Sequence, residues 1–128
     1  MIRSHQEYKE YIEADRIALF MNKNRPGILD EIWKWEILLR KTEYYKNCKF
    51  KGYIGKIIYG ILRWRFHRES VRLGFSIPLN TCGKGLSLAH YGSVAINPKS
   101  KIGERCRIYG DVVIGAKNPG GGGTHYWQ

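Results

Sequence analysis

The sequence predicts an α+β fold in which an α-helical segment, residues 1–74, is followed by a short parallel β-helix over residues 75–117. In the first segment, apolar residues recur at the three- and four-residue spacing of amphipathic helices. From position 90 to position 115 the residues recur every six, a period that neither a helix nor an ordinary strand produces. Residues 118–128 are predicted to form an irregular glycine-rich tail.

The first helix is predicted from about Ser4 to Phe20. Ser4 and Glu7 have the spacing of a capping box, in which the serine side chain accepts a hydrogen bond from the backbone three residues on. A connector that contains a proline follows. Apolar residues from Ile28 onward then mark a second helix that reaches about Asn47.

The third helix is predicted from about Tyr53 to Leu73, and Gly74 is placed where a helix commonly ends. It carries an apolar stripe of Ile54, Ile57, Ile58, Ile61 and Leu62, followed by Arg63, Arg65, Arg68 and Arg72. Cations near a helix C-terminus are stabilised by the helix dipole. A helix lying on an anionic membrane is an alternative. An apolar stripe more often faces a core or a subunit interface, so a membrane surface is not the expected partner.

The six-residue repeat predicts its own core. Its first place holds Ile96, Ile102, Ile108 and Ile114, and its fifth place holds Cys82, Leu88, Val94, Ser100, Cys106 and Val112. A six-residue face is too short to bury its apolar side alone, so stacked coils are expected to bring both columns inside a narrow prism. The exception is His90, a polar ring that falls on a first place.

The formal net charge of +11 suits an anionic partner such as a nucleotide cofactor, a nucleic acid or a membrane, although an ordinary basic surface would have the same composition. No nucleic-acid recognition motif is present, so nucleic acid is not expected. The three cysteines lack the spacing of a zinc site or a disulfide framework, which favours the cytoplasm and no metal. No signal peptide or membrane-spanning run is recognised.

The run GFSIPLNTCGKGLSLAHYGSVAINPKSKIGERCRIYGDVVIGA, residues 74–116, resembles the catalytic region of serine acetyltransferases, which are hexapeptide-repeat acyltransferases. The segments EADRIAL and EIWKWEILLRKTEYYKNC resemble the helical lead-in of that family. The resemblance implies a left-handed β-helix, although parallel crossovers are otherwise right-handed. It also implies a cytoplasmic enzyme of cysteine biosynthesis that assembles as a homotrimer or a dimer of trimers. Acetyl would move from acetyl-CoA to the hydroxyl of L-serine without a permanently bound cofactor.

His90 in LAHYG matches the catalytic histidine of the family, so the resemblance implies that it is the general base. It would take the proton from the acceptor hydroxyl as the oxygen attacks the thioester, a task that suits an imidazole near neutral pH. The family usually has an aspartate before this histidine, where Ala89 stands. A second aspartate orients the ring from the preceding coil, where Ser76 stands closest. The imidazolium therefore lacks its usual carboxylate partner.

Basic residues of the repeat are predicted to attract the phosphates of CoA, although solvated lysines on a repeat face are equally ordinary. They are Lys99, Lys101, Arg105 and Lys117. Among the other histidines, His5 and His67 are interpreted as solvated, and His125 lies in the tail without a family match.

Two alternatives to serine acetylation stay open. One is acetylation of a surface-polysaccharide sugar, and the other is a non-catalytic interaction module. The six-residue period fails at Asn118, so the sequence predicts a C-terminally truncated repeat that is weakly active or inactive.

Overall fold

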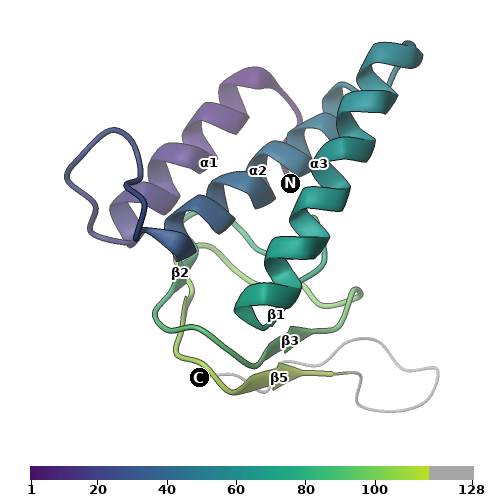
Figure 1. The fold of residues 1–128 in the computed structure, drawn as a ribbon. Helices are drawn as coiled ribbons and strands as arrows, with labels where there is room; N and C mark the ends of the chain where they lie inside the picture. Colours follow the sequence, from purple (N-terminus) through teal and green to yellow (C-terminus); the bar gives the residue numbers. More distant parts are fainter. Residues whose placement is uncertain (116–128) are drawn as a thin grey trace.

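The computed structural model describes residues 1–115. Within this range, three helices precede five short strands (Figure 1). The helices are α1 (His5–Ala18), α2 (Glu31–Cys48) and α3 (Gly52–Leu73). The strands are β1 (Phe75–Ser76), β2 (Ser87–Leu88), β3 (Val94–Ile96), β4 (Arg107–Ile108) and β5 (Val112–Ile114).

The predicted signals at the helix ends are confirmed at two places. The Ser4 side chain accepts a hydrogen bond of 3.1 Å from the backbone N–H of Glu7, so the cap of α1 forms as expected. Gly74 ends α3 in the left-handed region at φ 82°. A Cβ there would lie 2.8 Å from the Cα of Gly92, so glycine is required both by the turn and by the close approach of the backbone. By contrast, Ile28 precedes α2 in an exposed turn.

The strands pair in parallel. β1, β3 and β5 form one sheet in that order, β2 and β4 form a second, and a single bridge joins Cys82 to Ile102. Residues of both predicted columns are buried, apart from half-buried Val112: Cys82, Leu88, Val94, Ile96, Ser100, Ile102, Cys106, Ile108 and Ile114. The six-residue period thus identified the inward-facing positions of this segment, except at His90, which is exposed.

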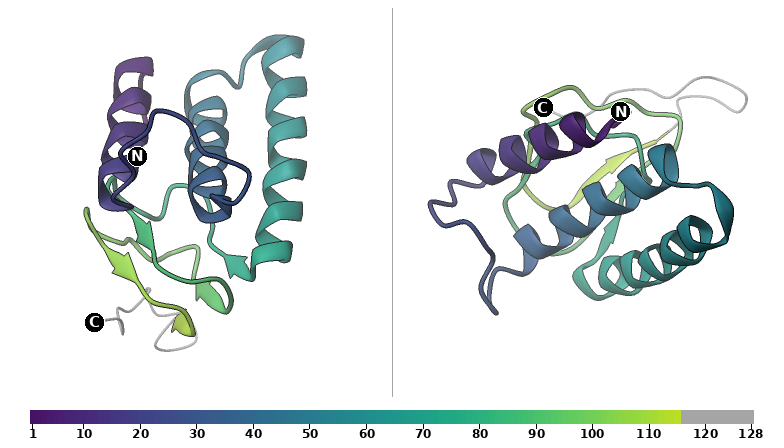
Figure 2. Two further views of the ribbon diagram at one scale, coloured as in Figure 1. Left: turned by 60° about the vertical axis from the view of Figure 1, so that its left-hand side comes forward. Right: turned by 90° about the horizontal axis from the view of Figure 1, so that it is seen from above.

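The predicted left-handed parallel β-helix is wrong. The described residues form strands of only two or three residues, in two small sheets and one bridge, and no left-handed β-helix is evident. Strands this short supply few ladder hydrogen bonds, and the helices complete their core. Trp35, Leu39 and Phe66 of the helices belong to the same apolar cluster as Leu88 and Ile96. The fold is therefore a layer of three helices packed on one side of short parallel strands (Figure 2).

Trp35 of α2 joins α2, α3 and β1. Its ring centroid lies 5.4 Å from that of Phe66 in α3 and 5.0 Å from that of Phe75 in β1. Its Nε1 donates a buried hydrogen bond of 2.9 Å to Oγ of Ser70. Aromatic packing and one satisfied indole N–H therefore hold the end of α3 at the first strand.

A buried charged network attaches α1 and α2 to residues 80–88. Nε of Arg40 lies 2.7 Å from Oδ2 of Asp15, and its Nη1 lies 3.1 Å from Oε1 of Glu43. The same guanidinium donates to the carbonyls of Cys82 and Gly83, at 2.9 and 2.7 Å. The fork geometry of arginine allows one side chain to satisfy carboxylates and carbonyls together.

Side-chain carboxyl groups of α1 and α2 accept hydrogen bonds from the backbone of the same segment. Oδ1 of Asp15 accepts from the N–H groups of Gly85 and Leu86, both at 2.9 Å. Oε2 of Glu36 accepts from the N–H of Leu88 at 3.1 Å. Buried backbone groups that have no strand partner are satisfied in this way, so the helices fix the segment that leads to residue 90.

Candidate active site around His90

His90 lies in the corner between β2 and β3, residues 89–93. Its side chain is exposed. Gly92 and Ser93 in this corner have positive φ angles of 94° and 22°, and the N–H of Gly92 donates to the carbonyl of Leu73 at 2.8 Å. The end of α3 therefore supports the corner that carries the ring, while the ring itself points away from the core.

The sequence frame placed His90 on a buried isoleucine place, and this is wrong. Leu88 pairs with Ile108, so His90 lies two residues beyond that register position. The reason is the length of the corner: residues 89–93 join β2 to β3, whereas residues 109–111 join β4 to β5. Two extra residues displace the histidine from the column, and Leu88 fills the inward place instead.

The neighbours of His90 belong to the corner between β4 and β5, residues 109–111. The ring centroids of His90 and Tyr109 are 6.3 Å apart, and a Cβ on Gly110 would lie 4.0 Å from the Cβ of His90. Within residues 1–115 no hydrogen bond or ion pair joins the His90 ring to another side chain. The exposed ring is accessible to a ligand from solvent. Ala89, which precedes the histidine, carries no carboxylate that could orient the ring.

The predicted CoA-phosphate residues lie at different corners. Lys99 is exposed in the turn after β3, where its N–H donates to Oδ1 of Asn97, and Lys101 follows it. Arg105 lies in the turn before β4, where its N–H donates to the carbonyl of Lys84 at 2.8 Å. The structure therefore does not bring the lysines together with Arg105. Lys117 lies outside the described residues.

A cleft of about 420 Å³ lies between the end of α1 and the turns beside β2 and β4. It combines an apolar wall with three cations, and its lining includes Ile17, Phe20, Lys84, Arg105 and Arg107. The Arg107 guanidinium lies 5.5 Å from the Phe20 ring centroid, and its Nη1 donates to Oγ of Ser87 at 3.2 Å. Such a surface suits a ligand that is apolar in one part and anionic in another.

A second cleft, of about 230 Å³, shares Ser87 and Arg107 with the first. Its lining also includes Ala89 and Tyr91, the two residues that flank His90. Arg107 thus lies at the border of the two clefts, between the cationic turn and the corner of the histidine. Sequence reasoning missed Arg107 and Lys84, because a basic residue between two column positions resembles any solvated residue of a repeat.

The cysteines have structural surroundings. Burial raises the pKa of the Cys82 thiol to about 12, and the thiol therefore stays protonated at neutral pH. Cys106 is buried in the same apolar cluster. His5 and His67 are exposed, and His125 lies outside the described residues. The described part of the chain contains no group of three metal-ligating side chains.

No protein-family model matches this chain, and no match was found among curated proteins or among solved structures. Within residues 1–115 no helix combines the length and apolar character needed to cross a bilayer.

Proposed function

We propose that the chain is an O-acyltransferase that moves acetyl from acetyl-CoA to the hydroxyl of a small acceptor, with L-serine as the first candidate. The observation that carries the proposal is the pair of adjoining clefts. One offers Lys84, Arg105 and Arg107 to the phosphates of CoA, and the other reaches the two neighbours of His90. His90 itself lines neither cleft, but the cationic cleft is joined through Ser87 and Arg107 to the one that reaches its neighbours. This arrangement matches the needs of an acyl-CoA and a hydroxyl acceptor.

In this proposal His90 is the general base. Its imidazole takes the hydroxyl proton while the acceptor oxygen bonds to the thioester carbonyl carbon. The carbon–sulfur bond then breaks, and the imidazolium returns the proton to the departing CoA thiolate. Because no carboxylate is hydrogen-bonded to the ring among the described residues, its orientation depends on the corner itself and on the bound acceptor, which favours a slow enzyme.

The proposal includes assembly as a homotrimer. His90 lies among exposed aromatic residues, Tyr91 and Tyr109, which are more than half exposed. A neighbouring copy packed against this corner would cover both rings and enclose the acceptor. Light scattering of the purified chain measures this directly, and an active monomer would contradict it.

The decisive experiment is a thiol-release assay with acetyl-CoA over L-serine and a panel of sugars, with wild type and His90→Gln. We expect His90→Gln to lower kcat about a hundredfold or more while KM for acetyl-CoA stays near its original value. Arg107→Gln should instead raise KM for acetyl-CoA. His67→Gln, an exposed histidine elsewhere, is the matched control. A His90→Gln protein that keeps most of its kcat, or a wild type without thiol release on any acceptor, overturns the proposal.

A further inference from the structure

The outer face of α3 is apolar and faces solvent. It consists of Tyr53, Ile54, Ile57, Ile61 and Trp64, whose exposed fractions are 88%, 75%, 60%, 55% and 58%. Their spacing of three and four residues places them on one side of the helix. The core is made by the opposite side, with Leu62, Phe66 and Leu73 buried. The predicted apolar stripe of α3 is therefore divided: Ile54, Ile57 and Ile61 are exposed, whereas Leu62 is buried.

Such a row of large apolar side chains marks a surface that meets another apolar phase. α3 lies at one edge of the helical layer, with α2 between it and α1 (Figure 2). The N-terminal end of α3 is far from the strands (Figure 1). The connection that precedes it adds Phe50, which is 48% exposed and packs edge-on against Tyr59 at 5.3 Å between ring centroids. Phe50 thus adds apolar surface at the tip of the helical hairpin.

The same helix is strongly basic. It contains Lys56, Arg63, Arg65, Arg68 and Arg72, and Glu69 is its only acidic residue. Glu69 is already occupied by Arg72, which lies 2.6 Å from its Oε1. Within residues 1–115, Arg65 and Arg68 form no ion pair. The uncovered apolar face is therefore bordered by positive charge that has no counter-charge in the described part of the chain.

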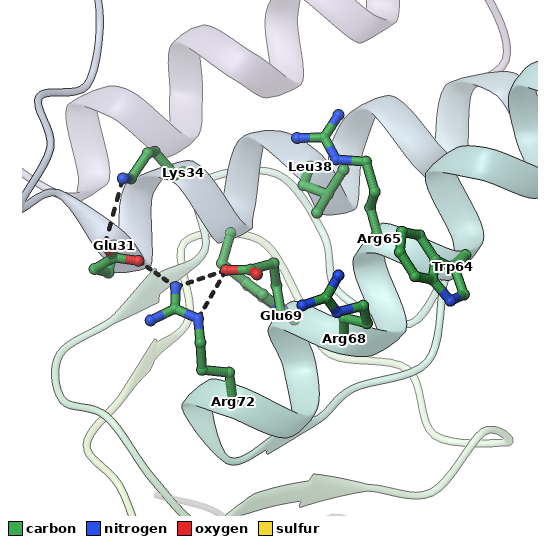
Figure 3. Close-up of a pocket in the computed structure, with 9 residues that line it drawn as sticks. Glu31, Lys34, Leu38, Trp64, Arg65, Arg68, Glu69 and Arg72 are labelled. Carbon is green, nitrogen blue, oxygen red and sulfur yellow. Dashed lines mark hydrogen bonds and ion pairs between the residues drawn. The ribbon is translucent and has the colours of Figure 1, made fainter.

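Figure 3 shows where these free cations gather. A groove of about 510 Å³ between α2 and α3 is lined by Trp64, Arg65 and Arg68, and the Arg68 guanidinium lies 4.9 Å from the Trp64 ring centroid. At the other end of the groove, Arg72 is bound to Glu31 and Glu69. The end next to the apolar face thus offers two unpaired guanidinium groups to an anion.

We propose that the outer face of α3 binds an anionic lipid surface, with its apolar side chains in the interfacial region and Arg65 and Arg68 on headgroup phosphates. An amphipathic helix with interfacial aromatic residues and flanking arginines is the form that peripheral membrane binding takes. Long arginine side chains reach headgroups while their stems lie along apolar surface. This inference does not depend on the acyltransferase proposal.

Charge argues against the two other occupants of this face. A second copy on this face would bring the same uncompensated arginines of α3 against each other. A nucleic acid would neutralise the arginines but leave Tyr53 and the three exposed isoleucines in water. An anionic bilayer satisfies the apolar and the cationic parts of the surface together.

The test is flotation of the full 128-residue chain with vesicles of phosphatidylcholine alone and of phosphatidylcholine with about one third phosphatidylglycerol. We expect at least about tenfold stronger binding to the anionic vesicles, and weaker binding as the salt concentration rises. Equal binding to both vesicle types, or no binding to either at low salt, overturns the proposal.

Variants assign the binding to the outer face. Ile57→Glu with Ile61→Glu should lower partition into anionic vesicles about tenfold or more, and Arg65→Glu with Arg68→Glu should do the same. The matched control is Val113→Glu, an apolar residue of β5 that is 70% exposed, and it should bind as wild type does. All five positions are exposed, and unchanged thermal unfolding confirms the fold of each variant.

Two results would transfer the face to another occupant. If the isoleucine variant dissociates an oligomer in light scattering and the wild type ignores vesicles, a second copy covers the face. If the arginine variant loses binding to a DNA duplex while the isoleucine variant keeps it, and vesicles are not bound, the surface is electrostatic only. Either result overturns the lipid proposal, and neither bears on thiol release by His90.

Discussion

The inner side of α2 and the outer face of α3 reverse the usual distribution of side chains. α2 buries Glu36, Arg40 and Glu43 completely or nearly so, whereas α3 leaves Ile54 and Ile57 in solvent. Charged residues are almost never fully buried unless they are paired, so the buried charges of α2 require partners within the protein. The exposed isoleucines of α3 instead suggest a partner outside it.

The two regions differ in whether the fold provides partners for these side chains. The buried polar side chains of α2 meet partners in the described structure. Arg40 meets carboxylates and carbonyls, Glu43 accepts from the N–H of Asn80, and Oε2 of Glu36 accepts from the N–H of Leu88, while Oε1 of Glu36 has no hydrogen-bond partner there. Ile54, Ile57 and Ile61 of α3 are mostly exposed there, and only Ile58 packs against the core. The burial of a side chain therefore does not by itself indicate its role. A side chain with partners inside the fold has a structural role, whereas a large apolar side chain without them indicates an external partner.

The largest expected effect comes from breaking the buried network. Arg40→Met removes the only cation of the network, leaving Asp15 and Glu43 buried without a counter-charge and the Cys82 carbonyl without its donor. We expect a loss of about 3–5 kcal/mol in the free energy of unfolding, measured by urea denaturation. Arg65→Met, an exposed arginine without an ion pair among the described residues, is the matched control and should change little. A similar loss in both variants would mean that the network contributes no more than a surface arginine.

The buried network around Arg40 could not be predicted from the sequence, for a physical reason. A charged residue in a helix is ordinarily solvated, and Arg40 follows a run that reads as an amphipathic helix. Two of its partners, Cys82 and Gly83, are more than forty positions away and are contacted through the backbone carbonyls, which any residue carries. Side-chain patterns therefore could not identify them.

Other features were predictable because they depend on local chemistry. Ser4 and Gly74 mark helix ends through one hydrogen bond and one backbone angle. The six-residue period predicted the buried isoleucines, but it could not predict the two additional residues in the corner at 89–93. A change in corner length shifts the frame without altering its residues, and for that reason the exposure of His90 was missed.

A smaller effect is expected where α2 meets the inner side of α3. Ser70→Ala leaves the buried Nε1 of Trp35 without its 2.9 Å acceptor while adding no bulk. We expect a loss of about 1–3 kcal/mol in unfolding free energy. Ser70→Thr keeps a hydroxyl and should recover part of it. An alanine variant as stable as wild type would show that another acceptor replaces the serine.

Glu36 should give the network a characteristic pH dependence. Burial first, and then the charge of Asp15, raise the pKa of Glu36 well above its ordinary value of 4.5. Below pH 4.5 Glu36 holds its proton in both the folded and the unfolded state, and the stabilisation is fully present. As pH rises, the unfolded state releases its proton first, so stability falls until the pH passes the folded-state pKa.

Glu36→Gln tests this sign, because an amide keeps an acceptor for the N–H of Leu88 but cannot ionise. We expect the variant to be at least as stable as wild type at pH 7 and to lose stability less steeply between pH 5 and 7. Thermal unfolding measured across that range is the readout. Parallel curves for the two proteins would show that Glu36 does not hold its proton in the folded state.

The smallest effect is expected on the outer face of α3. Replacing Ile54, Ile57 and Ile61 together by glutamine removes three large apolar side chains that contact little in the described structure. The unfolding free energy should change by no more than about 0.5 kcal/mol per site, since glutamine is a good helix former and exposed positions tolerate exchange. Leu62→Gln, one position away on the buried side, should instead cost several kcal/mol, about the sum of lost burial and an unpaired amide. If the triple variant proves as destabilised as Leu62→Gln, the isoleucines are part of the core and the face has no external partner. If it folds normally, their role lies outside the folded chain, because the fold would keep three exposed isoleucines that it does not need.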